Sequence, residues 1–319
     1  MRNRALNSRV ASSTAKQPTL AYRAVEALAR RLNIQEPYRH GIEAAIAHLA
    51  EENAEGAQPQ KDMYRRFAIE ERSIGGSPVF IFRSKATPPA RRVLFLHGGG
   101  GMMRATYFHY VFLTRLILQT HAEVWMPFYP LAPGCNFHDS LRACMAAYRA
   151  MLLEHDAMPC AFAGDSAGAN LELAVCRQAL DEGLDTPRCI VCISPATGFH
   201  EPGYYERFKA KEQAARDPLL CAEMVQGIRD NWYADMPLDD VLGNPAFIDY
   251  AGFPPVLEYL GTAEIFHPST EDIVARMEEA GIEATCVRGE GLMHDWALLN
   301  YFPEGAAAHC QIKRFILGH

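Results

Sequence analysis

A serine between two glycines is the feature that most constrains the fold of this 319-residue chain. Residues 164–168 read Gly-Asp-Ser-Ala-Gly, after an apolar run and before a helix-like segment. On a sharp strand-to-helix turn the neighbours of the serine must be small, because larger side chains would keep the turn from closing. Such a turn exposes the Ser166 hydroxyl near free N–H groups of the next helix. The motif is short and built from common residues, so the rest of the chain decides its meaning.

Around this motif the chain alternates between short apolar runs and longer amphipathic segments. Runs such as residues 93–96 are typical of strands buried on both faces. The alternation predicts an α/β fold with a mostly parallel central sheet flanked by helices. The expected strands cover residues 63–72, 78–82, 93–96, 123–128, 159–163, 189–193, 254–260 and 284–288. The expected helices cover residues 108–119, 138–154, 166–181, 269–280 and 306–317.

Two parts of the chain fall outside this alternation. Residues 19–33 and 41–52 predict two amphipathic helices that pack outside the main sheet, and we expect residues 1–16 to be flexible. Between residues 198 and 249 the alternation stops in an aromatic-rich segment. We expect this segment to be an insertion over the carboxyl edge of the sheet, where ligands bind in open α/β folds.

The composition excludes several other classes of protein. With 31 basic and 38 acidic residues, the net charge of −7 argues against a nucleic acid or an anionic membrane surface as the main partner. We expect no membrane span and no signal peptide. Cys189 and Cys192 have C-x-x-C spacing, but they lie inside a predicted strand, where successive side chains alternate in direction and residues three apart point to opposite faces. We therefore expect the nine cysteines to be buried reduced thiols in a cytoplasmic protein, and no metal site. The sequence leaves a homodimer open.

A serine nucleophile needs donors for the oxyanion, and a glycine run supplies them. Residues 96–101 read Leu-His-Gly-Gly-Gly-Gly directly after a buried strand. Without side chains, the N–H groups of Gly98 and Gly99 can approach a substrate oxygen, together with the N–H of Ala167. The run lacks the Gly-Lys-Ser/Thr of a phosphate loop and does not fit the dinucleotide-binding pattern. We therefore predict an oxyanion hole at these three residues.

The candidate base is His294, on a loop after the last predicted strand. A lone histidine is more often structural, but the order serine, acid, histidine along the chain is the one this architecture uses. His97 is nearer to the glycine run, and we expect it to support that loop by hydrogen bonding.

The candidate acid is Glu264, on the loop after the strand at residues 254–260. Its carboxylate would orient the imidazole of His294 and stabilise the imidazolium. Glu271 and Asp272 compete for this role, but they fall in the following helix. Asp165 precedes the nucleophile on the tight turn, and we interpret it as a support of that turn.

Together these motifs resemble the hormone-sensitive-lipase-like branch of the α/β-hydrolase serine esterases. The resemblance runs from about residue 93 to the C-terminus, with the motifs in the expected order. They are the segments at residues 97–100, 164–168, 129–133 (Tyr-Pro-Leu-Ala-Pro), 194–195, 217–218, 253–255, 261–264, 280–281 and 293–294. The resemblance implies the triad Ser166, His294 and Glu264, no cofactor, and a helical cap. In this division residues 1–60 contribute helices to the cap, residues 61–198 and 250–319 form the core, and residues 199–249 are the cap insertion.

The resemblance implies hydrolysis of short- to medium-chain acyl esters of small molecules through an acyl-enzyme. The same groups would also serve an amidase, a deacetylase or an arylformamidase. A non-catalytic ligand receptor is the third alternative, although relatives of that kind have lost the histidine that this chain keeps at position 294. One departure from the family is Gly101, which extends the glycine run and predicts a wider alcohol side of the pocket.

Overall fold

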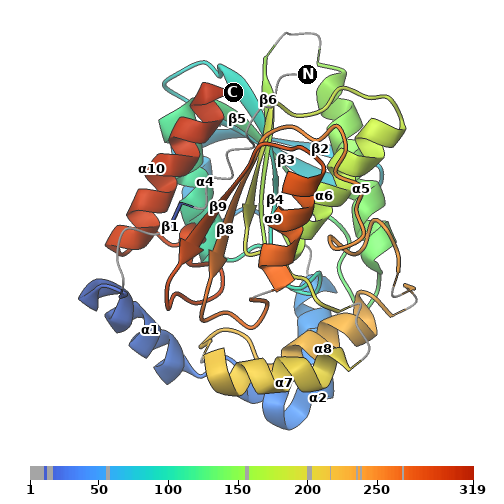
Figure 1. Ribbon diagram of the computed structural model, residues 1–319. Helices are drawn as coiled ribbons and strands as arrows, with labels where there is room; N and C mark the ends of the chain where they lie inside the picture. Colours follow the sequence, from blue (N-terminus) through green and yellow to red (C-terminus); the bar gives the residue numbers. More distant parts are fainter. Residues whose placement is uncertain are drawn as a thin grey trace, which may run out of the picture.

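The centre of the protein is a twisted sheet of nine strands in the order β1-β9-β8-β7-β6-β4-β5-β3-β2 (Figure 1). The computed structural model describes residues 11–12, 17–54, 58–154, 158–199, 203–215, 217–234, 236–237, 239–267 and 269–319. The strands are β1 (Ala11–Ser12), β2 (Phe67–Ile74), β3 (Ser77–Ser84), β4 (Arg91–Leu96), β5 (Ala122–Pro127), β6 (Cys160–Asp165), β7 (Cys189–Ile193), β8 (Val256–Gly261) and β9 (Ala284–Gly289).

Helices cover both faces of this sheet. Helices α4 and α10 pack on one face, and α5, α6 and α9 pack on the other, so each face has its own apolar core (Figure 1). The helices are α1 (Leu20–Leu32), α2 (Glu36–Ala54), α3 (Lys61–Arg66), α4 (Tyr107–Thr120), α5 (Phe137–Leu152), α6 (Ala167–Asp181), α7 (Tyr204–Ala215), α8 (Ala222–Asn231), α9 (Ser269–Glu279), the 3₁₀ turn η1 (Trp296–Leu298) and α10 (Pro303–Gly318).

The sheet is mostly parallel, which confirms the predicted fold class. Strands β4 to β9 and β1 pair with one another in parallel, whereas β3 pairs antiparallel with β5 and β2 pairs antiparallel with β3 at one edge. These two strands form a hairpin in which Ile74 faces Ser77. Gly75 and Gly76 make the turn with φ of +60° and +83°, a conformation that glycine adopts without strain.

The structure corrects three expectations at the N-terminal end. Residues 63–66 belong to helix α3 and not to a strand, because Asp62 pairs with Arg65 and Arg66 at helical spacing. Helix α2 begins at Glu36 and contains a kink at Gly41. Residues 1–16 were expected to be flexible, but residues 11–12 form strand β1 beside β9. The other residues of this segment lie outside the described residues.

Helices α2, α7 and α8 lie together at the carboxyl edge of the sheet (Figure 1). Gln35, just before α2, joins the N-terminal region to the insertion: its Nε2 donates to the carbonyls of Asp217 and Leu220 at 2.9 and 2.7 Å. Ile228 of α8 packs directly over Gly100, in the loop that follows β4. This part of the insertion therefore lies over the glycine run.

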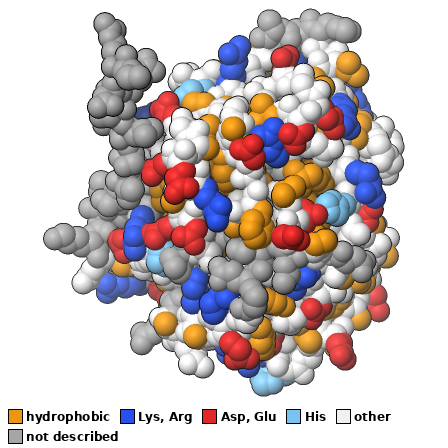
Figure 2. Space-filling model, turned by 45° about the vertical axis from the view of Figure 1, so that its right-hand side comes forward, with side chains coloured by type: hydrophobic (Ala, Val, Ile, Leu, Met, Phe, Trp, Pro, Cys, Tyr) orange, Lys and Arg blue, Asp and Glu red, His pale blue; other side chains and the backbone are white. Residues whose placement is uncertain are grey.

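The surface shows mixed charge. On the face drawn in Figure 2, acidic and basic side chains are interspersed among apolar ones. Among the described residues, no helix combines the length and apolar character needed to cross a membrane. All nine cysteines are unpaired, but not all are buried as expected: Cys135 and Cys160 are half-buried and Cys310 is exposed.

Candidate active site

Ser166 lies on a strained turn between β6 and α6. Its backbone has φ of 50° and ψ of −117°, a conformation that a non-glycine residue adopts only when its surroundings enforce it. A Cβ on Gly168 would lie 2.0 Å from the carbonyl oxygen of Leu96, and one on Gly164 would lie 2.9 Å from the backbone of Gly168. Both glycines are therefore required so that β6, α6 and the end of β4 can pack this closely.

Ser166, His294 and Glu264 lie together in one chain of contacts. The Ser166 Oγ is 3.0 Å from His294 Nε2, and His294 Nδ1 is 3.3 Å from Glu264 Oε2. A neutral imidazole with its proton on Nδ1 satisfies both contacts, since Nδ1–H donates to the carboxylate and Nε2 accepts from the hydroxyl. The three side chains are buried and come from the ends of β6, β8 and β9, where the carboxyl ends of parallel strands meet.

The competing acids lie elsewhere. Glu271 of α9 accepts from Arg288 at 2.7 Å and pairs with His267 at 3.3 Å. Asp272 is exposed. Of the three carboxylates that the sequence offered, only Glu264 lies within hydrogen-bond distance of His294 in the described part of the chain.

The electrostatic surroundings of His294 favour its protonated form. Burial alone would lower the pKa of His294, but Asp295 and Glu264 outweigh it and raise this pKa well above its usual range. Asp295, the next residue, places its Oδ2 3.2 Å from His294 Nε2. Burial raises the pKa of Asp295 to about 6, against the opposing effect of His294.

The glycine run borders the nucleophile. A Cβ on Gly98 would lie 3.0 Å from the Cβ of Ser166, and Gly99 has φ of +109°. In the described chain the N–H groups of Gly98 and Gly99 have no acceptor among the protein's own groups. Ala167 is the first residue of α6, so its N–H has no partner within the helix. The N–H groups of Gly98, Gly99 and Ala167 are therefore candidate donors for an oxyanion.

His97 is a part of this loop. Its Nδ1 contacts the carbonyl of Gly98 at 2.8 Å, and its ring stacks on Tyr129 with the centroids 4.5 Å apart. The Tyr129 hydroxyl donates to the carbonyl of His97 at 2.5 Å. Burial lowers the pKa of His97 to about 4, so the ring is neutral at physiological pH. These contacts support the loop and leave His97 away from Ser166.

The expectation of a wider pocket at Gly101 is wrong. A Cβ on Gly101 would lie 2.1 Å from the indole of Trp232, so this ring occupies the space that a side chain at position 101 would take. Trp232 is fully buried, and its Nε1 donates to Ser140 Oγ at 3.0 Å. Because the insertion fills the space from a distant part of the sequence, the local motif did not reveal it.

Asp165 contacts a histidine other than His294. Its Oδ2 lies 3.0 Å from Nε2 of the buried His109, whose Nδ1 accepts from the backbone N–H of Thr106 at 2.8 Å. Burial acts to lower the pKa of His109, but Asp165 outweighs it and raises this pKa. Asp165 thus ties the serine turn to α4. Nothing around His109 in the sequence distinguishes it from the other histidines, so no motif predicts this contact.

The loop that carries His294 is held by two side chains from outside the core sheet. The Tyr22 hydroxyl, from α1, accepts from the N–H of Met293 at 2.7 Å. Asp217 Oδ2, from the insertion, accepts from the N–H of His294 at 3.3 Å. The motif at residues 217–218 indicated that Asp217 has a role, but nothing in the sequence of α1 indicated the contact of Tyr22 with Met293.

We expect Tyr22→Phe to lower kcat by roughly tenfold with little change in KM, because a small displacement of the histidine loop disturbs its alignment with Ser166. The variant removes only the acceptor for the Met293 N–H and leaves a buried donor unpaired, which costs about 1–3 kcal/mol. Tyr64→Phe is the matched control, since its hydroxyl is exposed and donates to Gln58. Steady-state kinetics of both variants check this. Equal kcat values for the two would contradict a positioning role for Tyr22.

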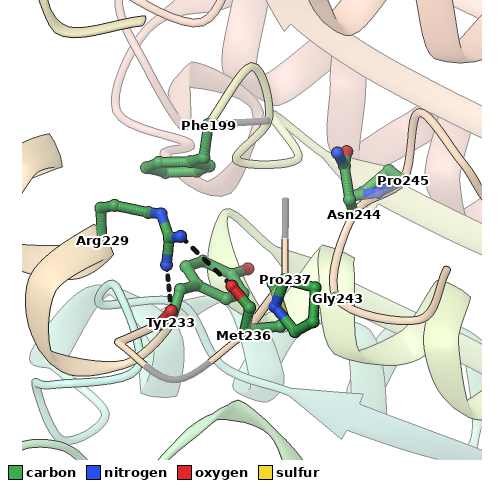
Figure 3. Close-up of a pocket in the computed structure, with 8 residues that line it drawn as sticks. All are labelled: Phe199, Arg229, Tyr233, Met236, Pro237, Gly243, Asn244 and Pro245. Atoms are coloured by element: carbon green, nitrogen blue, oxygen red, sulfur yellow. Dashed lines mark hydrogen bonds between the residues drawn. The ribbon is translucent and has the colours of Figure 1, made fainter. Parts of the chain in front are cut away.

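An aromatic cluster lines the neighbourhood of His294. The ring of Phe266 lies 5.4 Å from the His294 ring, and Phe199 lies 5.8 Å from Phe266 and 5.4 Å from Tyr233. Beyond it is a small pocket in which the Arg229 guanidinium donates to the carbonyls of Tyr233 and Met236 (Figure 3). Its lining residues are Phe199, Arg229, Tyr233, Met236, Pro237, Gly243, Asn244 and Pro245. This pocket adjoins the aromatic cluster and does not include Ser166.

Comparison with known proteins identifies the family of this chain. A family model for the alpha/beta hydrolase fold matches residues 93–298. The chain belongs to this α/β-hydrolase family, which confirms the prediction from the motifs. An esterase of Acinetobacter venetianus is 28% identical over 235 residues, covering 72% of this chain and 76% of the relative. An acetyl-hydrolase of Streptomyces hygroscopicus is 29% identical over 226 residues, covering 70% and 74%.

Solved structures share the whole fold. An esterase/lipase from an uncultured bacterium superposes with a TM-score of 0.79 at 23% identity, covering 94% of this chain and 98% of the other. An esterase described as a member of the bacterial hormone-sensitive lipase family gives a TM-score of 0.77 at 23% identity, with coverage of 95% and 99%. The likeness extends beyond the motif-bearing core to the helices that precede it.

Proposed function

We propose that this protein is a serine carboxylic ester hydrolase that acts on small-molecule esters through an acyl-enzyme. The observation that carries the proposal is the chain of contacts from Ser166 Oγ through His294 to Glu264 Oε2, at 3.0 and 3.3 Å. The esterase and acetyl-hydrolase relatives support it by the activities in their names. A buried serine, histidine and carboxylate in this order are the parts that nucleophilic acyl transfer needs.

In the first half-reaction Ser166 Oγ attacks the ester carbonyl carbon and its proton passes to His294 Nε2. Glu264 holds the proton on Nδ1 and stabilises the imidazolium that forms. The carbonyl oxygen becomes an oxyanion beside the free N–H groups of Gly98, Gly99 and Ala167. His294 then gives its proton to the leaving alkoxide, so that an alcohol departs and the acyl group remains on Ser166.

The second half-reaction uses the same groups with water. His294 Nε2 takes a proton from a water molecule, whose oxygen attacks the acyl carbon. The oxyanion forms again beside the same N–H groups, and the proton then passes from His294 to Ser166 Oγ as the carboxylic acid leaves. No other group has to supply or accept a proton, so His294 alone serves as base and acid in both halves.

We propose short- to medium-chain acyl groups, from acetyl to hexanoyl, as the substrates. Bulky rings support this limit: Trp232 of the insertion fills the space over Gly101, and Phe266, on the loop after β8, packs near His294 and against Phe199 of the insertion. The name of the acetyl-hydrolase relative agrees with a small acyl group. We also place the protein in the cytoplasm, where its nine unpaired cysteines would remain reduced.

Hydrolysis of p-nitrophenyl esters from acetate to palmitate tests the proposal. We expect kcat/KM to be highest between acetate and hexanoate and to fall for longer chains. Matched p-nitrophenyl acetate and p-nitroacetanilide separate an esterase from an amidase. A higher kcat/KM for the anilide would overturn the ester assignment, and equal rates across all chain lengths would overturn the limit on the acyl group.

A further inference from the structure

A second carboxylate faces the nitrogen of His294 that must accept the proton of Ser166. Asp295 Oδ2 lies 3.2 Å from Nε2, while Ser166 Oγ lies 3.0 Å from the same atom. Asp295 is held in this direction by its backbone, which has φ of +55° and donates its N–H to Ser194 Oγ at 3.2 Å. Its other oxygen, Oδ1, is buried and has no partner among the described residues. The triad accounts for none of these features.

The hydrogen-bonding needs of Ser166 Oγ, His294 Nε2 and Asp295 Oδ2 cannot all be met when His294 is neutral and Asp295 is ionised. The lone pair of Nε2 would then face a carboxylate oxygen, which is repulsive. One additional proton removes the conflict, because an Nε2–H can donate to Asp295 Oδ2. The raised pKa values of both His294 and Asp295 agree with a proton held between them.

We propose that Asp295 is a positioning residue that holds a proton on His294 Nε2 in the resting enzyme, so that Ser166 gains its base only after this proton leaves. The inference rests on the proposed hydrolase function. Loss of the proton to solvent leaves neutral His294, with its remaining proton on Nδ1, and ionised Asp295. The Asp295 side chain is 18% exposed, so it can turn toward water and leave Nε2 to accept from Ser166.

During the reaction the contact between Asp295 Oδ2 and His294 Nε2 favours transfer of the Ser166 proton to the histidine. When Nε2 receives the proton of Ser166, the imidazolium again faces the Asp295 carboxylate, which stabilises it. Asp295 thus makes His294 a stronger base. Because a stronger base holds its proton to higher pH, the active enzyme, in which His294 is neutral, appears only at higher pH.

Other charged groups surround this pair and contribute to its titration. Glu264 faces His294 from the loop after β8, and Asp217 faces it from the insertion. Asp165, on the turn before Ser166, acts on Asp295 electrostatically and is itself paired with His109. All of these groups are retained when Asp295 alone is substituted. A difference in titration between the wild type and an Asp295 variant therefore reports on Asp295.

The test compares the wild type with Asp295→Asn. Asparagine keeps the size of the side chain and tolerates a positive φ, so the loop should be preserved. We expect the acid limb of the pH profile of kcat/KM to move to lower pH by at least about one unit, because a neighbouring opposite charge shifts a pKa by about 1–3 units. Asp272→Asn, an exposed site with the same charge change, is the matched control and should leave the limb unmoved.

NMR titration of the His294 ring nitrogens, assigned by their loss in His294→Gln, gives a readout that does not need turnover. The midpoint for His294 should fall in Asp295→Asn by the same amount as the acid limb. Unchanged midpoints and an unchanged acid limb would overturn the proposal. A shifted midpoint in a protein that hydrolyses no ester would instead support the His294–Asp295 contact and overturn the proposed function.

Discussion

Ser166→Ala is expected to lower kcat for ester hydrolysis by about 10⁴–10⁶-fold, because the acyl-enzyme can no longer form. The remaining rate would come from the oxyanion donors and from binding alone. The change removes one oxygen atom from a residue whose backbone is already fixed by the close packing of Gly164 and Gly168. Folding should therefore be unaffected, and the measurement is the rate of p-nitrophenyl butyrate hydrolysis by the purified variant.

Ser194→Ala is the matched control for this variant. Ser194 is also buried and also has a positive φ, but its Oγ contacts the backbone of Asp295 and not His294 Nε2. We expect it to retain activity within about tenfold, since it supports the site only indirectly. A Ser166→Ala variant as active as the Ser194→Ala variant would place the nucleophile elsewhere.

Glu264→Gln is expected to lower kcat by roughly 10³–10⁴-fold, because an amide no longer selects the imidazole tautomer with its proton on Nδ1 and no longer stabilises the imidazolium. Glu264 is fully buried and its Oε2 lies 3.3 Å from His294 Nδ1. Binding of substrate should change little, so the effect should appear in kcat. The measurement is a comparison of kcat and KM with the wild type.

Glu271→Gln carries the same chemical change on the neighbouring helix. Its carboxylate binds Arg288 and His267 instead of His294, and we expect kcat within about twofold of the wild type. A large loss of kcat in Glu271→Gln together with a small one in Glu264→Gln would reverse the assignment of the acid.

The parts of the fold that the sequence revealed are those with local signals. The strands β4, β6 and β7 each contain a continuous apolar run, and the hairpin turn at Gly75 and Gly76 is marked by its glycines. The turn around Ser166 was evident because only small residues fit where α6 passes close to Leu96. These features depend on residues that are adjacent in the sequence, so a short sequence motif is enough to predict them.

The parts that the sequence did not reveal depend on contacts between distant segments. The bond from Met293 to Tyr22 joins residues 271 positions apart, and nothing in the spacing of α1 distinguishes Tyr22 from a core residue. The space over Gly101 is filled by Trp232, which lies in an insertion with no regular period. Asp295 follows the predicted base in the sequence. Its carboxylate faces His294 Nε2 only because the Asp295 backbone has a positive φ and donates to Ser194, which the sequence does not show.

Covalent labelling tests whether Ser166 is an activated nucleophile more directly than any rate measurement. The protein is treated with a fluorophosphonate probe, digested with trypsin and analysed by mass spectrometry. The peptide covering residues 150–177 contains Ser166 as its only hydroxyl-bearing residue, so an adduct on its hydroxyl has one possible location. We expect one adduct per chain, on this peptide, with parallel loss of esterase activity. An unlabelled peptide in a protein that still hydrolyses esters would contradict this expectation.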